Sequence, residues 1–345
     1  MTGAIKTRPI GQGQADGPTP KPSLDGLLAL VGDDLARVNQ LILDNMHSPV
    51  PLIPQLAGHL IAAGGKRLRP ILTLAAAKLC GYRGERHLGL AACVEFIHSA
   101  TLLHDDVVDE SKLRRGLDTA NAVWGNQASV LVGDFLFSRA FQLMVADGSL
   151  EVLEILSTAS AVIAQGEVHQ LATANNLETT VEDYMTVIRS KTATLFAAAA
   201  EIGAVVAERP AAEREALRDF GMNLGIAFQL VDDYLDYAAS QDLLGKTVGD
   251  DFREGKMTLP VVLAVARADG PERAFWHRTL SELDQREADL AQAMRLLDDC
   301  GALEDTLIEA RRFGEEARRA LAIFPDSRAR RELLGVVDFC IARTA

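Results

Sequence analysis

The spacing of hydrophobic residues along this chain follows the period of an α-helix nearly throughout. Between Leu27 and Ile42 the apolar positions recur every three or four residues, and Ser23 stands where an N-cap is expected. Glycine and proline fall mostly between such segments, and no convincing period-two alternation predicts a strand. We therefore predict an all-α bundle with a largely apolar interior. Further helices are predicted over residues 52–63, 71–80, 87–110, 128–146, 150–175, 181–207, 211–240, 258–267, 280–300, 303–321 and 328–342.

The chain divides into a short tail and one large domain. With 345 residues, 48% of them hydrophobic, it can bury the core of one large domain or two small ones. No linker rich in proline, glycine or serine interrupts it after the first twenty or so residues, which favours a single domain over residues 23–345. Residues 1–22 are rich in Gly, Pro, Thr and Gln and poor in large apolar groups, so we expect a disordered N-terminal tail.

Charge and cysteine usage exclude several classes of partner. The 35 basic and 48 acidic residues give a net charge of −13, which argues against binding to nucleic acid or to an anionic membrane. No charge-free apolar run reaches the roughly eighteen residues of a membrane span, and the N-terminus lacks the apolar core of a signal peptide. The four cysteines lie far apart and form no CxxC pair. We therefore expect a cytoplasmic protein without a transmembrane segment.

Two acidic motifs dominate the candidate chemistry. The first lies at the end of an apolar helical run, and like charges four residues apart repel one another, so a cation must offset them. A lone copy could be a solvated helix end or a cap, but a second copy in another apolar helix favours a shared site. Oxygen-only ligands suit Mg²⁺ better than Zn²⁺. The motif residues are Asp105, Asp106 and Asp109, and then Asp232, Asp233 and Asp236.

Basic residues accompany these motifs. Lys66, Arg67 and Arg69 follow a Gly-Gly turn and precede Pro70 at a predicted helix start, which makes either an anion site or a solvated loop. Lys191, with Thr192, lies on a helix between the motifs, where a lysine can also extend outward to solvent. A glycine-rich loop with Lys246 and Lys256 could close over a phosphate or be an ordinary polar connection.

His98 precedes Asp105 by two helical turns, so it is either a satisfied core histidine or part of the same anion site. Together with Glu95 it also matches one ligand pair of a di-iron carboxylate bundle. That design needs a second Glu-x-x-His, and no predicted helix contains one, which disfavours redox chemistry at iron.

Taken together, acidic motifs, basic clusters and an apolar bundle suit the departure of a diphosphate from a hydrocarbon. Aspartates can hold so anionic a group only through divalent cations, which also neutralise the charge that develops as the carbon–oxygen bond breaks. The carboxylates would then be metal ligands, and the dry interior would protect a carbocation from water.

The same motifs, in the same order, resemble those of the trans-polyprenyl diphosphate synthases, and the resemblance runs from about residue 23 to the C-terminus. It rests on residues 64–70, the first acidic motif with Arg114-Arg115-Gly116, Lys191-Thr192, residues 229–236 and Gly245-Lys246. The sequence of residues 96–104 is most similar to that of the long-chain bacterial octaprenyl and decaprenyl diphosphate synthases, which supply quinone side chains such as that of ubiquinone. The resemblance implies an isoprenoid-synthase bundle around a central apolar cavity, and a homodimer.

The resemblance also assigns roles. It implies that Asp105, Asp109, Asp232 and Asp236 bind Mg²⁺, with Asp106 and Asp233 supporting them in catalysis. Lys66, Arg67, Arg69, His98 and Arg115 would bind isopentenyl diphosphate. An allylic primer, farnesyl or geranyl diphosphate, would meet Arg114, Lys191, Thr192, Gln229, Lys246 and Lys256.

Product length is a question of packing along the helix that carries the first motif. Ala100 and Thr101, one turn before Asp105, are small where short-chain members of the family typically place an aromatic residue, so we predict a long product. The floor of the tunnel lies deeper, at Ile97 or beyond. Two alternatives stay open: an isoprenoid cyclase of the same fold, and a non-catalytic subunit that regulates a partner synthase.

Overall fold

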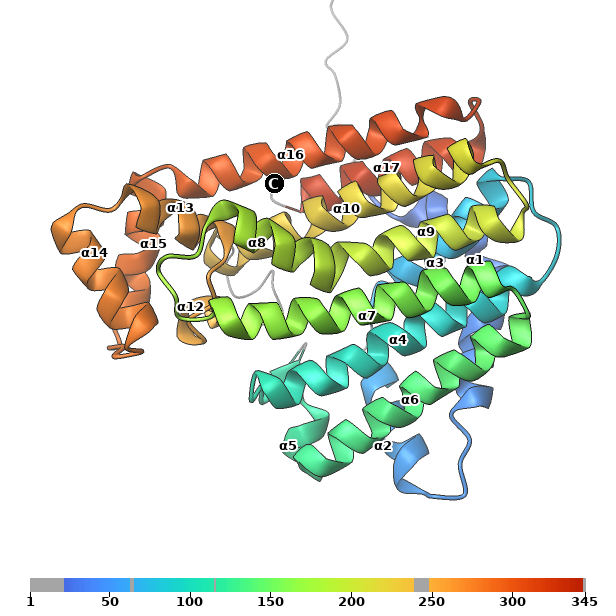
Figure 1. Cartoon of the computed structure of the whole chain (residues 1–345), viewed down its shortest axis with the longest axis horizontal. Coiled ribbons are helices and arrows are strands. Elements are labelled where there is room, and N and C mark those ends of the chain that lie inside the picture. Colours follow the sequence, from blue (N-terminus) through green and yellow to red (C-terminus); the bar gives the residue numbers. More distant parts are fainter. Residues whose placement is uncertain (1–21, 63–64, 115, 239–247, 344–345) are drawn as a thin grey trace, which may run out of the picture.

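The computed structural model describes residues 22–62, 65–114, 116–238 and 248–343. Apart from one small hairpin, the secondary structure of these residues is helical, so the predicted all-α class is confirmed (Figure 1). The hairpin pairs β1 (Leu113–Arg114) with β2 (Leu117–Asp118) in antiparallel register. The predicted tail lies almost wholly outside the described residues.

The helices of the first half include the one that leads to the first acidic motif, and those of the second half include the one that carries the second motif. They are α1 (Asp25–Asn45), α2 (Leu52–Ala62), α3 (Leu68–Leu79), α4 (Arg86–Val108), α5 (Ala120–Trp124), α6 (Asn126–Asp147), α7 (Leu150–Thr173), α8 (Val181–Ile188), α9 (Thr194–Val206), α10 (Ala211–Ala238), α12 (Asp250–Arg253), α13 (Leu259–Arg267), α14 (Gly270–Trp276), α15 (Asp289–Asp299), α16 (Ala302–Ala320) and α17 (Arg328–Ala342). Two π-helical turns, η1 (Arg189–Ala193) and η2 (His277–Ser281), and one 3₁₀ turn, η3 (Leu321–Ile323), complete them.

Hydrophobic patterning located the long helices well and the short connections poorly. The predicted helix over residues 280–300 is wrong in its first part, because the chain leaves the helix after Ser281 and α15 begins only at Asp289. Leu283 adopts a left-handed φ of 53°, which a helix cannot contain. The Asp289 carboxylate accepts a hydrogen bond from the backbone N–H of Arg286 at 2.7 Å and so fixes the start of α15.

Other local predictions also need correction. Ser23 is not the N-cap of α1; Leu24 holds that position, and the Ser23 hydroxyl accepts a bond from the Asp25 N–H instead. The helix expected from residue 71 begins earlier, at Leu68, with Pro70 already inside its first turn. The short helices α5, α12 and α14 and the hairpin have too few residues to show a period.

Two clusters of buried side chains form the interior, and α10 contributes to both. Phe220 and Leu224 pack into the cluster made mainly by α1, α3, α4, α6, α7 and α9. Leu230 and Val231 pack into the cluster made by α8, α13, α15 and α16. Figure 1 shows α4, α7, α9 and α10 as long neighbouring helices, with α13, α14 and α15 gathered at one end. The second acidic motif therefore lies on a helix anchored in both halves of the core.

Two glycines allow α7 and α10 to approach the π-helical turn η1 closely. A Cβ on Gly166 of α7 would lie 2.9 Å from the backbone nitrogen of Lys191. A Cβ on Gly225 of α10 would lie 2.6 Å from the Cα of Ala193. Because neither position has room for a side chain, η1 is held between the two helices, and the directions of Lys191 and Thr192 are fixed.

One helix, α6, has an exposed apolar face. Among the described residues it alone has the length and hydropathy of a membrane span, and 33% of its apolar stretch is buried. Asp134 and Arg139 interrupt that stretch. One side of α6 packs against α4, while Leu131, Phe141 and Val145 remain 67%, 39% and 68% exposed. The helix therefore packs into the core on one side and exposes apolar side chains on the other.

Candidate active site

Each aspartate of the first motif faces a cation from a different part of the chain. An Asp105 oxygen lies 3.8 Å from the ammonium of Lys191. Asp106, which is 1% exposed, accepts three bonds from the Arg114 guanidinium, the shortest at 2.7 Å. Asp109 follows the last residue of α4 and accepts a bond from Lys256 at 3.0 Å. The positive charge that we expected to offset the repulsion between these acids therefore comes from three side chains, Lys191, Arg114 and Lys256.

The second motif, on α10, has more varied partners. Asp232 pairs with the guanidinium of Arg343, near the end of α17, at 2.6 Å. The buried Asp233 accepts hydrogen bonds from the Tyr184 hydroxyl at 2.5 Å and from the Gln229 amide at 2.7 Å. Asp236 accepts a bond from the backbone N–H of Asp251 at 3.2 Å.

The two motifs meet through shared neighbours. Within η1, Lys191 faces Asp105, and the Thr192 hydroxyl donates to Gln229 beside the second motif at 2.9 Å. The segment around α12 forms a second link, because Asp251 contacts the second motif and Lys256 contacts the first. The structure thus brings both motifs, 127 positions apart from Asp105 to Asp232, to the border of one site.

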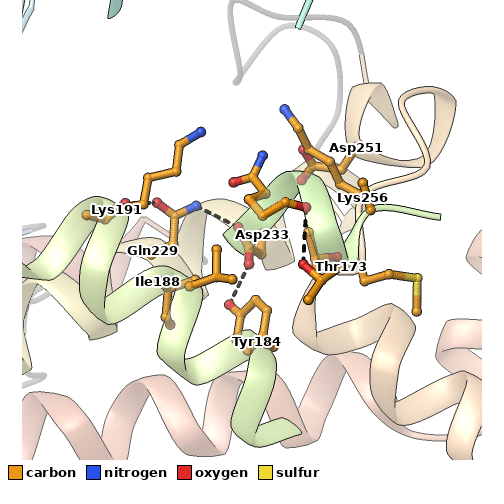
Figure 2. A pocket seen from close by; sticks show the side chains of 14 residues that line it. Thr173, Tyr184, Ile188, Lys191, Gln229, Asp233, Asp251 and Lys256 are labelled. Atoms are coloured by element: carbon orange, nitrogen blue, oxygen red, sulfur yellow. Dashed lines mark hydrogen bonds between the residues drawn. The ribbon is translucent and has the colours of Figure 1, made fainter. Parts of the chain in front are cut away.

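A pocket of about 130 Å³ opens between α7, α8, α10 and the segment that follows α12. Its lining includes Tyr184, Ile188, Lys191, Gln229, Asp233 and Lys256. Figure 2 shows Gln229 and Tyr184 converging on Asp233, with Lys191 and Lys256 at the same pocket. The pocket is lined by lysine and aspartate side chains and also by apolar side chains, a combination that suits a diphosphate with a hydrocarbon tail.

The pKa shifts reflect this concentration of charge. Burial raises the pKa of Asp105, and the nearby carboxylates of Glu167 and Asp109 raise it further, against the opposing effect of Lys191. Burial also raises the pKa of Asp233. For Lys256, burial opposes the charged form, but the neighbouring carboxylates outweigh it and raise the pKa. The buried carboxylates of this site are therefore stabilised by any additional cation.

The donor set fits hard divalent cations. Among the residues that the structure describes, no three His, Cys, Asp or Glu side chains are arranged as a ready metal site. Lysine and arginine instead engage Asp105, Asp106, Asp109 and Asp232. Oxygen-only donors with excess negative charge suit a cation such as Mg²⁺ or Ca²⁺.

A separate basic cluster lies at the start of α3. Arg67, the N-cap, has a left-handed φ of 49° and forms an ion pair with the buried Glu95. A guanidinium nitrogen of Arg69 lies 3.1 Å from the His98 ring, and Lys66 lies over the ring of Phe339. Because the pair Glu95 and His98 faces arginines, these two residues belong to the basic cluster, and the di-iron interpretation has no support in their contacts.

Some predicted site residues lie away from this pocket or outside the described residues. Arg115 and Lys246 lie outside the described residues. Ala100 and Ile97 are fully buried on α4 and Thr101 is partly exposed, but none of the three lines the pocket of Figure 2. Their role in product length stays a prediction.

Sequence analysis did not identify four of the residues at the site. Glu167 pairs with Lys191 at 2.8 Å, and Tyr184, Asp251 and Arg343 contact the second motif. None belongs to a charge cluster that stands out in the sequence, except Asp251, whose loop we singled out for its lysines.

The comparisons with known proteins agree with this geometry. The family model of polyprenyl synthetase matches residues 50–297. The chain belongs to the polyprenyl synthetase family. It is 47% identical to the octaprenyl diphosphate synthase of Escherichia coli (strain K12) over 321 residues, which cover 93% of the chain and 99% of that protein. The resemblance stated from the motifs is therefore confirmed, and the chain is a trans-prenyltransferase.

Solved structures of this family share the fold. A polyprenyl synthase from Caulobacter crescentus CB15, complexed with calcium and isoprenyl diphosphate, superposes with a TM-score of 0.91 at 53% identity, covering 95% of this chain and 100% of that one. A decaprenyl diphosphate synthase from Rhodobacter capsulatus gives a TM-score of 0.90 at 53% identity, with coverage of 94% and 100%. The predicted isoprenoid-synthase architecture is thereby confirmed.

Proposed function

We propose that this enzyme extends an allylic diphosphate with isopentenyl diphosphate and makes a long-chain all-trans polyprenyl diphosphate. The observation that carries the proposal is one pocket lined by Asp233 of the second motif and by Lys191 and Lys256, which pair with Asp105 and Asp109 of the first motif. A separate basic cluster lies at the start of α3. Two sites that can each bind a diphosphate suit two diphosphate substrates. Relatives named for octaprenyl and nonaprenyl products support a long chain.

The basic cluster would hold isopentenyl diphosphate. Lys66, Arg67, Arg69 and His98 supply its cations and donors, with Arg115 as a further candidate outside the described residues. Buried Glu95 offsets part of this charge and holds Arg67 in place. A bound diphosphate would accept charge-assisted hydrogen bonds from the cationic side chains of this cluster.

The allylic diphosphate would lie between the motifs. Lys191, Gln229 and Lys256 line the pocket there, and Arg114 and Lys246 are further candidates. When its carbon–oxygen bond breaks, these residues hold the leaving diphosphate while the isopentenyl double bond attacks the allylic carbon. A proton is then lost to the released diphosphate. Apolar side chains around the pocket exclude water from the carbocation.

Mg²⁺ is the metal that we propose. Asp105, Asp109, Asp232 and Asp236 would hold it, and it would supply positive charge to the departing diphosphate. The all-oxygen donor set supports this choice, and the Caulobacter relative was solved with calcium, another divalent cation.

A second copy of the chain would cover the exposed face of α6. Leu131, Phe141 and Val145 give that face an apolar character that a homodimer would bury. Light scattering after gel filtration should give the mass of a dimer for the wild type and of a monomer for Leu131→Glu with Val145→Glu. Leu150→Glu, at an 81% exposed position outside α6, is the control and should stay dimeric.

The cellular role follows from the product. A long polyprenyl chain suits the side chain of a quinone such as ubiquinone. All four cysteines are free thiols, which agrees with the reducing cytoplasm that we propose as its location.

The test incubates the purified chain with radiolabelled isopentenyl diphosphate, farnesyl or geranyl diphosphate, and Mg²⁺. Elongation supports the proposal, and a mass spectrum of the dephosphorylated product gives the number of isoprene units. A cyclic hydrocarbon would identify a cyclase. If the chain forms a product only after a partner subunit is added, it is a regulatory subunit.

A further inference from the structure

Asp233 differs from its neighbours in the kind of group that it contacts. Asp105, Asp106, Asp109 and Asp232 all pair with lysine or arginine side chains. Asp233 is 3% exposed, and its two oxygens accept bonds from two neutral donors, the Tyr184 hydroxyl and the Gln229 amide. Each oxygen thus accepts a bond from another side chain of the protein, and Asp233 is the member of the second motif that links α8 to Gln229, which suits an anchor for other side chains.

The bonds to Asp233 fix the direction of a longer chain of hydrogen bonds. Since a carboxylate only accepts, Gln229 must turn its NH₂ group toward Asp233. Its carbonyl oxygen then faces the Thr192 hydroxyl, which donates to it at 2.9 Å. Because the Thr192 hydroxyl donates its hydrogen to Gln229, the hydroxyl oxygen can act only as an acceptor toward the pocket that it lines. The second amide hydrogen of Gln229 remains available as a donor.

Tyr184 lies at the end of this series of hydrogen bonds, opposite Thr192. It is 4% exposed on α8, whose start is fixed by a capping box between Thr180 and Asp183. Its hydroxyl ties α8 to α10 at a distance of 2.5 Å from Asp233 (Figure 2). The aromatic ring gives this bond a rigid support, because Tyr184 has few rotatable bonds and is enclosed by the core.

We propose that Tyr184 is a positioning residue for the transfer reaction, and that it acts through Asp233 to orient Gln229 and Thr192. Asp233 then serves the reaction as an acceptor and not as a ligand of the metal. The inference rests on the proposed function, because Gln229 and Thr192 are assigned there to the allylic substrate. Turnover should depend on Tyr184, whereas metal binding should not.

The experiment compares Tyr184→Phe, Asp233→Asn and Asp232→Asn with the wild type. We expect Tyr184→Phe and Asp233→Asn each to lower kcat about tenfold, equivalent to about 1.4 kcal/mol, with an unchanged half-saturating concentration of Mg²⁺. Asp232→Asn should raise that concentration about tenfold or more. Because the first two changes interrupt one chain of bonds, the double variant should lose little more than the worse single variant.

A second measurement does not depend on turnover. Calorimetric titration with Mn²⁺ and inorganic diphosphate should give wild-type affinity for Tyr184→Phe and Asp233→Asn, and weaker binding for Asp232→Asn. Tyr82→Phe, which removes a hydroxyl from a partly exposed tyrosine distant in sequence from both motifs, is the matched control and should match the wild type in both assays. Thermal melting checks that each variant is folded.

Either of two results overturns the inference: wild-type kcat in Tyr184→Phe, or a loss of Mn²⁺ affinity in Asp233→Asn as large as that in Asp232→Asn. A wild-type chain that fails to elongate any primer would instead refute the proposed function, and the titration would still decide whether Asp233 is a ligand. If Asp233→Asn does not fold, Tyr184→Phe alone carries the test, since phenylalanine fills the same space.

Discussion

The ammonium group of Lys256 lies 3.0 Å from a carboxylate oxygen of Asp109, a residue 147 positions earlier in the chain. Lys256 also pairs with Glu254 at 2.5 Å, and the carboxylates of Asp251, Asp109 and Glu254 raise its pKa. The lysine therefore stays charged at any physiological pH, and it joins the segment after α12 to the first acidic motif. Four predictions follow from this and from the other contacts of the site.

Replacing Lys256 with Gln should raise the KM for the allylic diphosphate about tenfold, because a charge-assisted hydrogen bond contributes about 1.5 kcal/mol. Steady-state kinetics at saturating isopentenyl diphosphate measures the change. Lys78→Gln is the control: it removes another ion-paired lysine, 2.7 Å from Asp34, on α3. An equal effect of the two substitutions would show that Lys256 has no special part in substrate binding.

Removing divalent cations should abolish elongation, and added Mg²⁺ should restore it. Asp105→Asn should lower kcat/KM by about 100-fold or more, since one metal ligand and one buried charge are lost together. Asp219→Asn, on α10 with a 60% exposed side chain, should behave as the wild type. Full activity in the presence of a strong chelator would rule out the metal-dependent mechanism.

Ala100→Phe should shorten the product. Ala100 is fully buried on α4, one turn before Asp105, so a phenyl ring there would occupy the path that we assign to the growing chain. Chromatography of the dephosphorylated products measures the length. Ala317→Phe places the same bulk at a buried position of α16 and should leave product length unchanged. Wild-type products from Ala100→Phe would refute this path.

Gly225→Ala should destabilise the fold by about 1–3 kcal/mol, because its Cβ would lie 2.6 Å from the Cα of Ala193 and would push α10 away from η1. Gly32→Ala is the counterpart, a helical glycine with no atom within 4 Å of the added Cβ, and it should stabilise by about 0.4–1 kcal/mol. Urea unfolding measures both. Equal stability of the two variants would contradict the close packing around Lys191 and Thr192.

The long helices and the charged motifs could be predicted because their signals are local. Helical periodicity in residues 328–342 reflects which side of α17 is buried, and it gave both ends of that helix correctly. The Asp105 and Asp232 motifs stood out because acids at helical spacing in an apolar run are costly. Residues 282–288 were mistaken for helix because they are helix-compatible in composition, while the left-handed backbone at Leu283 depends on surrounding structure.

By itself, the sequence determined the all-α class, the two aspartate motifs and the family to which they belong, since these depend on side-chain chemistry at short spacing. Only the tertiary structure decided which cation faces which acid. Lys256 meets Asp109, Arg343 meets Asp232, and Tyr184 meets Asp233. These pairs arise when helices pack together to bury their apolar faces, and the energy of that packing is spread over the whole core. No short stretch of sequence therefore contains the information that pairs them.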